Sequence, residues 1–571
     1  MTEETVEPTA LPANAPVFER THDDPLMLPK QPAGVVPAER LTGYRIEQRL
    51  DDVAGTIHGH VVIRFANPTG KPLTKLPLLL HPNASAELGA EGASLVVTRV
   101  QRIQGGVLAH REVRPTLVTV DFVPAIPAKE SVTIRVDYEG QLRRLSTDAN
   151  DMLSQVIGSL ESMAGDGAAD YGLLAVGDGI MTVASAYPMV APYRDGSFDT
   201  GPPAKTGDLA YNDVADFEVI TRVPRGMLLV TNLVDDTPEA ARGGWMKVVS
   251  KGSHVRDFVL VGGRDLQRSH LDVDDTRITS VYRGRDAEGG KRALAMAASS
   301  LRTFERRFGD YPYRELDVVE ASLVGGVGGV EFNAMVLVAG MLYRDPLQGS
   351  PLGGILGEAL GPMKDQLSMT FDFTVAHEVA HQYFAGIVGN DSHRFPSLDE
   401  PMAQYAAGLA IEDRYGKAAA ERAMDAHVKM NYAVYRMLGG SDQPVLRDVR
   451  SFRTPAEYAA LVYGKAPYVY VELRRKLGDA RLHKAIRAAV DEHRFGLVTT
   501  EEWISSLEKA TGSREVRPTF SRWLRQTHAD ADLKVDASGT FVLERMLPSN
   551  LQGGPVDVRA LLKSMLDLKA P

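Results

Sequence analysis

The residues best suited to chemistry in this sequence are His377, Glu378 and His381, which form the pattern His-Glu-x-x-His within residues 374–384. On a helix, this spacing places the two imidazoles one turn apart on the same face, so both can reach one metal ion. Two histidines four residues apart can also be ordinary core residues, and so short a pattern arises by chance. A further ligand is needed to decide between these interpretations.

A candidate for the third ligand is Glu400, which follows His381 after eighteen intervening residues. It lies in residues 396–405, which we predict to begin a second helix because capping residues precede it. A catalytic zinc ion takes three protein ligands and keeps one coordination position for water. His377, His381 and Glu400 would complete this set of ligands.

The pattern His-Glu-x-x-His, then eighteen residues, then Glu resembles the M1 family of zinc aminopeptidases, gluzincins that are related in fold to thermolysin. The resemblance implies one zinc ion per chain, held by His377, His381 and Glu400. It also implies that Glu378 is the general base, which takes a proton from the attacking water and passes it to the leaving amine. An exposed helical glutamate without a catalytic role is the alternative for Glu378.

Residues 328–333, Gly-Gly-Val-Glu-Phe-Asn, resemble the Gly-x-Met-Glu-Asn exopeptidase motif of that family, although Phe332 stands where Asn is usual. The resemblance implies that Gly328, Gly329 and Glu331 bind substrate, with Glu331 on the free α-amino group. A buried carboxylate pairs best with a charged amine, which a mid-chain amide does not offer. A strand-end glutamate in a local salt bridge is the alternative for Glu331.

Residues 463–479 are similar to the family's Tyr-x-Lys-Gly segment and the helix after it. The resemblance implies that Tyr463 stabilises the transition state, since a neutral phenol can donate a hydrogen bond to the oxyanion. A packing tyrosine is the alternative, because three other tyrosines lie close in sequence. Asp391, His393 and Asp399 are further candidates, which could orient a ligand imidazole.

Length and composition bound the remaining possibilities. The chain has 571 residues, 44% hydrophobic and 24% charged, which is typical of a globular protein with two or three domains. A net charge of -10 argues against a nucleic-acid surface.

We expect no membrane-spanning segment, since no apolar run approaches the necessary length. The absence of cysteine excludes disulfides and a thiolate zinc site. The chain as written would be cytoplasmic, or periplasmic or extracellular after removal of an export signal.

Hydrophobic periodicity predicts a multidomain α and β fold, in which an antiparallel β-domain precedes a domain that is mixed α/β and then helical. The resemblance to the M1 family implies that this second domain is a thermolysin-like catalytic domain. We expect a disordered or extended tail over residues 1–40, the β-sheet domain over 41–264 and the catalytic domain over 265–530. A short C-terminal extension, 531–571, would hold a strand-like piece at 533–543 and a final helix from Val556.

Several strands and one helix are expected within these domains. Apolar alternation predicts strands at 57–65, 117–123, 132–138, 217–223 and 255–261. A three- and four-residue apolar spacing predicts a helix over 294–308, and the strand with Glu331 should lie at the edge of a sheet, where a peptide can pair with it. Insertions at 154–179 and 344–366 have no role that the sequence reveals.

The expected substrate is a peptide with a free N-terminus, although the preferred first residue stays open. The pocket for it is expected on residues 180–189 and 323–327. An endopeptidase or an epoxide hydrolase with the same zinc site is an alternative, because one branch of the family opens an epoxide. A non-catalytic M1-like scaffold is another, although the complete set of predicted catalytic residues argues against it.

Overall fold

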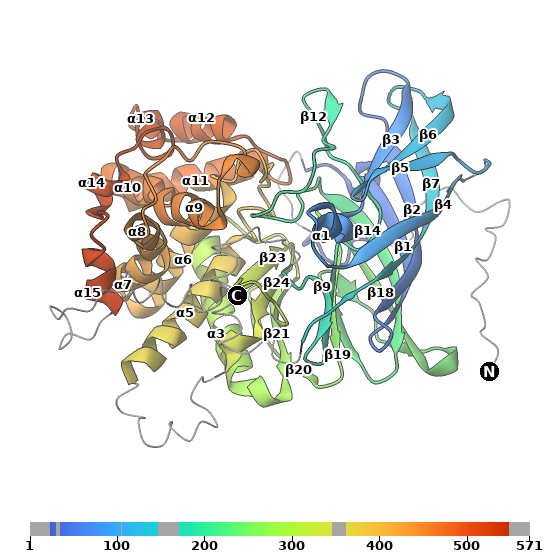
Figure 1. Ribbon diagram of the computed structural model, residues 1–571, viewed down its shortest axis with the longest axis horizontal. Coiled ribbons are helices and arrows are strands. Elements are labelled where there is room, and N and C mark those ends of the chain that lie inside the picture. Colours follow the sequence, from blue (N-terminus) through green and yellow to red (C-terminus); the bar gives the residue numbers. More distant parts are fainter. Residues whose placement is uncertain (1–22, 30–34, 104, 147–170, 345–360, 547–571) are drawn as a thin grey trace.

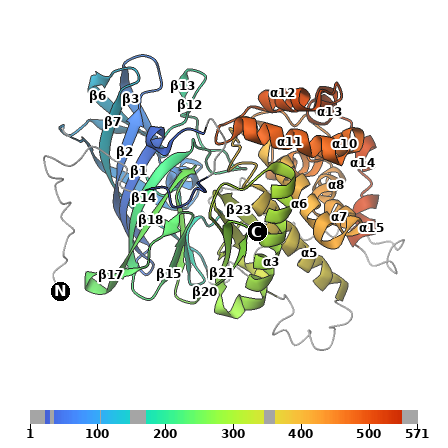
Figure 2. The same ribbon diagram turned by 180° about the vertical axis from the view of Figure 1, so that it is seen from behind.

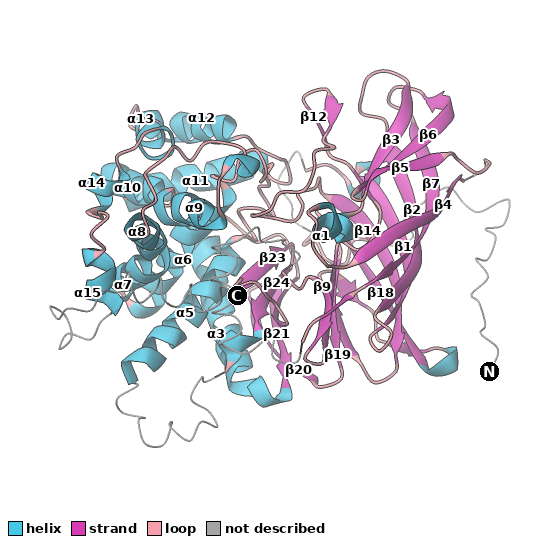
Figure 3. Cartoon of the chain, viewed as in Figure 1, coloured by secondary structure: helices cyan, strands magenta, loops and turns pink. Residues whose placement is uncertain are grey.

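The computed structural model describes residues 23–29, 35–103, 105–146, 171–344 and 361–546. Figure 1 shows a β-rich N-terminal half beside a helical C-terminal half, with a smaller sheet between them. Figure 2 shows the same division from behind, and Figure 3 shows how strands give way to helices along the chain. The predicted fold class, a β-domain followed by a mixed and then helical region, is therefore confirmed.

The largest sheet of the N-terminal half has eight strands. They are β1 (Thr42–Asp51), β2 (Thr56–Ala66), β4 (Ser94–Arg102), β7 (Ser131–Gln141), β14 (Ala215–Pro224), β16 (Val234–Asp235), β17 (Glu239–Ala240) and β18 (Trp245–Val255). Their order is β16-β18-β14-β1-β2-β7-β4, with β17 paired to β18. The pairs are antiparallel apart from β1 with β14, which run parallel. Alternate side chains of β2 and β7 are buried, which is why the predicted alternation gave these strands.

Two smaller sheets complete this half. One has the order β15-β19-β10-β9-β8, formed by β8 (Arg143–Arg144), β9 (Leu174–Gly177), β10 (Ile180–Ala184), β15 (Leu228–Thr231) and β19 (Val259–Gly263). The other has the order β11-β3-β6-β5, formed by β3 (Leu73–Leu79), β5 (His110–Arg114), β6 (Leu117–Ile126) and β11 (Met189–Val190). A hairpin of β12 (Tyr193–Arg194) and β13 (Ser197–Phe198) and a short helix, α1 (Ala84–Glu87), lie outside these sheets.

A five-stranded sheet begins the C-terminal half, in the order β20-β21-β22-β24-β23. Its strands are β20 (Leu266–Val273), β21 (Thr276–Arg283), β22 (Glu315–Ala321), β23 (Gly329–Phe332) and β24 (Met335–Ala339). The strand with Glu331, β23, lies at the edge of this sheet, as predicted. Helix α3 (Ala287–Phe308) contains the predicted helix, and its apolar positions are buried.

Helices form the rest of the described chain. They are α5 (Gly361–Ala380), α6 (Asp399–Tyr415), α7 (Lys417–Met424), α8 (Met430–Met437), α9 (Pro455–Tyr458), α10 (Tyr468–Leu477), α11 (Asp479–His493), α12 (Thr500–Thr511), α13 (Val516–Phe520), α14 (Ala529–Leu533) and α15 (Thr540–Met546). Three segments are π-helical, namely Asp425–Lys429, Ala459–Lys465 and Ser521–Arg525. Among the described residues, no helix combines the length and the apolar character needed to cross a bilayer.

The prediction of a strand-like piece at 533–543 is wrong. The segment instead ends helix α14 and begins helix α15, with Lys534 in a left-handed conformation between them. Packing against the helical half decides this, since the ring of Phe541 lies 4.2 Å from the ammonium of Lys429 and Arg545 pairs with Asp425 at 2.8 Å. The helix expected from Val556 lies outside the described residues.

Other expectations need smaller corrections. The strand expected at 255–261 is interrupted, because β18 ends at Val255 and β19 begins at Val259. Within the expected tail, Leu26 and Met27 are buried, and the Leu28 N–H donates to the Pro312 carbonyl at 2.8 Å. Of the two insertions, 154–170 and 345–360 lie outside the described residues, whereas Leu174–Gly177 is strand β9 and residues 361–366 belong to α5.

Candidate metal centre and peptide cleft

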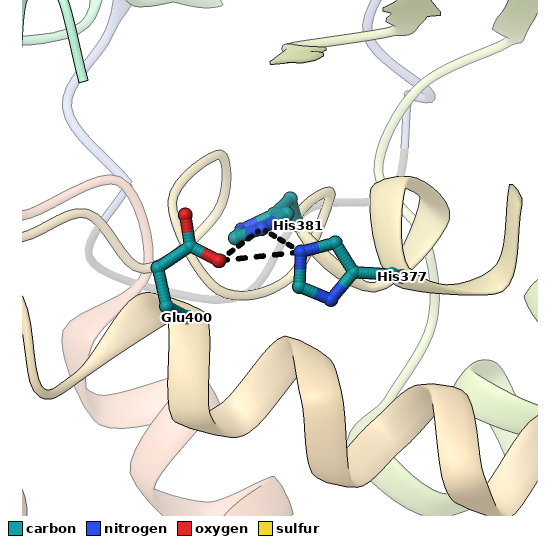
Figure 4. A group of neighbouring side chains, drawn as sticks. All are labelled: His377, His381 and Glu400. Carbon is teal, nitrogen blue, oxygen red and sulfur yellow. Dashed lines mark hydrogen bonds and ion pairs between the residues drawn. The ribbon is translucent and has the colours of Figure 1, made fainter. Parts of the chain in front are cut away.

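Helices α5 and α6 bring the three predicted ligands together. His377 lies in the last turn of α5, and His381 follows the end of that helix, with its N–H still directed at the His377 carbonyl at 3.3 Å. Glu400 is the second residue of α6. Figure 4 shows the three side chains pointing toward one another. The Nε2 atoms of the two histidines are 3.1 Å apart, and Oε2 of Glu400 lies 3.2 Å from the first and 3.4 Å from the second.

These distances fit a zinc ion. Tetrahedral bonds of about 2.0–2.1 Å place neighbouring ligand atoms roughly 3.3 Å apart. Nδ1 of His381 lies 2.8 Å from the Phe384 carbonyl, to which it donates a proton, so in the neutral ring Nε2 offers a lone pair. Oε2 of Glu400 is buried and has no hydrogen-bond partner. Lone pairs therefore converge from three sides on one point, an arrangement that a cation stabilises.

The charges of this group act strongly on one another. Burial disfavours the charged form of His381, but the carboxylates of Glu331 and Glu400 outweigh it and raise the pKa of this imidazole well above its usual value. Burial also disfavours ionisation of Glu400, yet the charge of His381 and the closeness of both imidazoles hold the pKa of this carboxyl below its usual range. Burial lowers the pKa of His377. The site therefore provides an ionised carboxylate for a bound cation.

Glu378 lies beside the three ligands and lines the same cleft. A Cβ atom added to Gly329 would lie 2.4–2.5 Å from the side chain of Glu378, so only glycine leaves this carboxylate room. Burial, together with the charges of Glu331 and Glu400, raises the pKa of Glu378 well above its usual value. The interpretation of this residue as an exposed helical glutamate is wrong, since it is 4% exposed.

Glu331 projects from the edge strand β23 toward the end of α5. Its Oε1 atom lies 3.8 Å from Nδ1 of His381, and an oxygen of Glu331, an oxygen of Glu378 and a nitrogen of His381 lie within 4.8 Å of one another. Burial raises the pKa of Glu331 to about 7. The neighbouring Gly328 packs against Thr374, one turn before His377 on α5. Strand β23 thus runs along the metal-binding helix α5. Gly328, just before the strand, lies beside Thr374, and Glu331 lies beside the ligand His381.

Tyr463 lies in the π-helical segment Ala459–Lys465, which carries its side chain to the metal centre. Its hydroxyl donates to Oε1 of Glu400 at 2.5 Å, the carboxylate oxygen that does not face the two imidazoles. The ring lies 6.2 Å from that of His377. Tyr463 therefore contacts a predicted ligand directly, whereas Tyr458, its neighbour in the cleft, packs against its ring at 5.8 Å.

The cleft around these residues has a volume of about 580 Å³. It is lined by the ligands, by Glu378, Glu331 and Tyr463, and by Ser185 and Val327 from the segments that we expected to form the substrate pocket. The structure thus brings the three predicted ligands, Glu378, Tyr463 and the residues Gly328, Gly329 and Glu331 to one cavity. A cavity of this size holds a peptide of a few residues better than a large folded substrate.

The three candidates for orienting a ligand imidazole bond elsewhere. Oδ2 of Asp399 accepts from Nδ2 of Asn390 at 3.0 Å, Asp391 accepts from the Arg394 N–H at 2.9 Å, and Nε2 of His393 lies 3.2 Å from the Asp208 carbonyl. The backbone carbonyl of Phe384 holds His381 instead. None of these hydrogen bonds is made to a ligand imidazole, so they do not support an orienting role for these three residues.

Sequence reasoning missed Asp208, Asn390 and Gln382. Asp208 reaches the cleft from the loop before β14, and the family resemblance, which extends to Gly207-Asp208, could have marked it. Asn390 lies in the loop between α5 and α6. Gln382 follows His381 directly, so its place beside the zinc motif could have marked it.

Comparison with known proteins agrees with this geometry. Residues 362–523 match the model of the Peptidase family M1 domain. The matched segment contains the three predicted ligands and Tyr463. The chain is 24% identical over 258 residues to Aminopeptidase M1-B of Oryza sativa subsp. japonica, which is 44% of this chain and 27% of that protein. It is 27% identical over 167 residues to Aminopeptidase N of Lactobacillus delbrueckii subsp. lactis, which is 27% of this chain and 18% of that protein. The matches thus span about a quarter or less of these curated relatives.

The fold of the chain is similar to that of a solved structure. The crystal structure of an M1 zinc metallopeptidase from Deinococcus radiodurans superposes with a TM-score of 0.59 at 17% identity, over 85% of this chain and 93% of that chain. The arrangement of β-domain, mixed sheet and helices is therefore shared over most of both chains.

Proposed function

We propose that this M1 protein is a zinc aminopeptidase, which hydrolyses the first peptide bond of peptides with a free N-terminus. The observation that carries the proposal is the position of Glu331. A half-buried carboxylate on an edge strand lies 3.8 Å from the ligand His381. The α-amine of a substrate on this carboxylate would leave its first carbonyl beside the metal ligands.

The metal ligands are His377, His381 and Glu400, with one zinc ion per chain. When bound there, zinc would act as a Lewis acid and lower the pKa of water to about 7. The chain's own residues supply the rest of the chemistry. Glu378, held against Gly329, accepts a proton from the attacking water at its carboxylate and delivers it to the leaving nitrogen.

Tyr463 is proposed to donate its hydroxyl proton to the developing oxyanion. In the free protein this hydroxyl donates to Glu400, so it must exchange that acceptor for the substrate oxygen during the reaction. Gly328 and Gly329 leave the edge of β23 free of side chains beside α5, and a substrate backbone can pair there as an added strand.

Two observations on similar proteins support this proposal. The curated relatives are named aminopeptidases, and the Deinococcus protein of similar fold has been solved with a Tyr-Ser-Ala substrate. A free amine at Glu331 accounts for exopeptidase rather than endopeptidase action, because a mid-chain amide would leave a buried carboxylate without a cation. An epoxide hydrolase or a scaffold would not require this carboxylate to pair with an amine.

The test is zinc analysis combined with hydrolysis of aminoacyl fluorogenic substrates, N-acetylated peptides and a small epoxide. We expect one zinc per chain and hydrolysis of the free-amine substrates alone. Glu378→Gln should keep zinc and lose roughly a hundred- to ten-thousandfold in kcat. Glu331→Ala should keep zinc and lose kcat/KM on free-amine substrates, whereas Glu112→Ala, at an exposed position of β5, should match the wild type.

Cleavage of N-acetylated peptides as fast as free ones would contradict the aminopeptidase proposal and favour an endopeptidase. Turnover of the epoxide without peptide hydrolysis would favour an epoxide hydrolase. Zinc binding with no turnover of any substrate would favour the non-catalytic scaffold.

A further inference from the structure

A second cavity adjoins the peptide cleft, between the β-rich half and the helical half of the chain. Its volume is about 380 Å³, and it shares Asn212 and Arg256 with the cleft, so the two cavities are neighbours. Phe65 and Tyr193 line it from the β-rich half, and Phe495, in the loop after α11, lines it from the helical half. The proposed peptide chemistry does not use this cavity.

Positive charge is concentrated in this cavity. The described residues that line it include four arginines, Arg40, Arg194, Arg256 and Arg494, and one carboxylate, that of Asp213. The whole chain carries a net charge of -10, so the cavity differs in sign from the protein as a whole. A cavity lined by charge of one sign attracts ions of the opposite sign. An anion is therefore the ligand to expect.

The single carboxylate neutralises one of these arginines. Oδ1 of Asp213 accepts a hydrogen bond from Arg194, which also donates to the Tyr193 carbonyl at 2.6 Å. Arg40 is exposed and forms no ion pair with any residue that the structure describes. The two remaining arginines are buried, and their surroundings decide what the cavity can bind.

Arg256 is a buried guanidinium without a counter-charge. It is 9% exposed and forms no ion pair within the described part of the chain. Its N–H groups donate at 2.7–3.1 Å to backbone carbonyls, those of Asn212, Ala385, Gly386 and Gly496. Each terminal nitrogen keeps one N–H without an acceptor among the described residues. Burial lowers the pKa of Arg256 to about 10, because the folded protein solvates this charge less well than water does.

Arg494 is the second buried guanidinium. Its side chain is 5% exposed, and one terminal nitrogen lies 3.2 Å from Oδ1 of Asp491, a half-exposed side chain. The Nε atom of Arg494 is buried and has no hydrogen-bond partner. The carbonyl of Gly496, two residues later, accepts from Arg256, so the two guanidinium groups come from segments in contact. Buried N–H groups are normally satisfied, and a ligand in the cavity can satisfy these.

We propose that this cavity binds a small oxyanion, whose phosphate or carboxylate group lies between Arg256 and Arg494. The planar guanidinium group matches two oxygens of either group, whereas a halide ion offers a single point of charge. The anion bridges the two halves of the chain, since Arg256 follows strand β18 and Arg494 follows helix α11. Its binding requires neither a peptide nor turnover.

The experiment titrates the zinc-loaded protein by calorimetry with inorganic phosphate, succinate and sodium chloride, each at the same ionic strength. We expect phosphate or succinate to bind once per chain and more tightly than chloride, and the tighter of the two identifies the group. Arg494→Gln should weaken this binding roughly ten- to a hundredfold, the effect of losing one charged hydrogen bond. Arg487→Gln, on α11 but outside the cavity and 43% exposed, should bind as the wild type does.

A second variant and a second measurement support the comparison. Arg40 is exposed, so Arg40→Gln leaves the core intact, and we expect it to weaken binding roughly two- to fivefold. The tighter anion should also raise the melting temperature of the zinc-loaded wild type, because it binds the folded state alone. The same concentration should raise that of Arg494→Gln less.

Two outcomes would overturn the proposal. One is binding of phosphate and succinate no tighter than that of chloride. The other is unchanged binding in a folded Arg494→Gln variant, which would place the anion at the metal centre or on the surface. If that variant does not fold, unchanged binding in Arg40→Gln is the rejecting result. Neither outcome bears on the aminopeptidase function, which is tested with peptides.

Discussion

Gln382 joins the metal-binding turn to the strand that carries Glu331. Its Nε2 donates to the backbone carbonyl of Phe332 at 2.7 Å, and its Oε1 accepts from the Ala334 N–H at 2.8 Å. Gln382 is fully buried, and it follows the ligand His381 directly. One amide thus fixes the hairpin of β23 and β24 against the residue next to the metal, which sets the spacing between metal and amine anchor.

Replacement of Gln382 by Met should therefore damage stability and catalysis together. The Phe332 carbonyl, the Ala334 N–H and the Tyr311 hydroxyl would lose their buried partner. We expect a loss of about 2–5 kcal/mol in the free energy of unfolding, measured in urea, and a lower kcat/KM with zinc content unchanged. A variant with wild-type kcat/KM would show that the amide does not position Glu331.

Gly329→Ala should remove activity while leaving the fold intact. The new Cβ would lie 2.4–2.5 Å from the carboxyl of Glu378, a flexible side chain that can move aside at little cost to stability. Once displaced, it no longer meets the attacking water, so kcat should fall at least about tenfold with an unchanged melting temperature.

Gly328→Ala is the matched control for this variant. Its Cβ would meet Thr374 at 3.3 Å, a contact that a small shift relieves, and we expect a smaller loss of kcat. Equal losses in the two alanine variants would show that the catalytic effect comes from the strand backbone and not from the crowding of Glu378.

Glu400→Gln tests the ligand assignment by metal content alone. The amide keeps the shape of the side chain but removes the negative charge that faces the two imidazoles at 3.2 and 3.4 Å. We expect zinc to be lost on dialysis against a chelator that leaves the wild type loaded, measured by elemental analysis. Glu331→Gln, which is not among the proposed ligands, should retain zinc. Full retention in Glu400→Gln would mean that this carboxylate is not a ligand.

Asp235 should make the stability of the β-domain depend on pH. Burial raises its pKa from 3.8 to about 6, although Ser250 and Thr231 donate hydrogen bonds to it. Its ionisation therefore costs the folded state on the order of 3 kcal/mol above about pH 6, and this cost disappears as the pH falls to about 4.

Asp235→Asn removes this titration. The free energy of unfolding of the variant minus that of the wild type, from urea curves, should increase between pH 4 and pH 7 by that amount. The same difference for Asp236→Asn, whose side chain is 61% exposed, should stay constant. A constant difference for Asp235→Asn would show that this carboxyl does not titrate in the range.

The parts of the fold that the sequence predicted are those set by local periodicity. The alternation in 57–65 and the three- and four-residue spacing in 294–308 correspond to β2 and α3, because one buried face is enough to impose each pattern. The same reasoning failed at 533–543, where two short helices are stabilised by contacts with distant residues such as Lys429 and Asp425. The few apolar residues of 533–543 fit both the alternation of a strand and the three- and four-residue spacing of a helix.

For the site, the sequence by itself determined that His377 and His381 share one face of a helix end, because their spacing is a property of the helix. Only the tertiary structure decided that Glu400 completes the triangle, that Asp208 lines the same cleft, and that Gln382 holds the strand of Glu331. These relationships join segments far apart in the chain, and the packing of α5 against α6 and the edge strand creates them. No local pattern in the sequence encodes that packing.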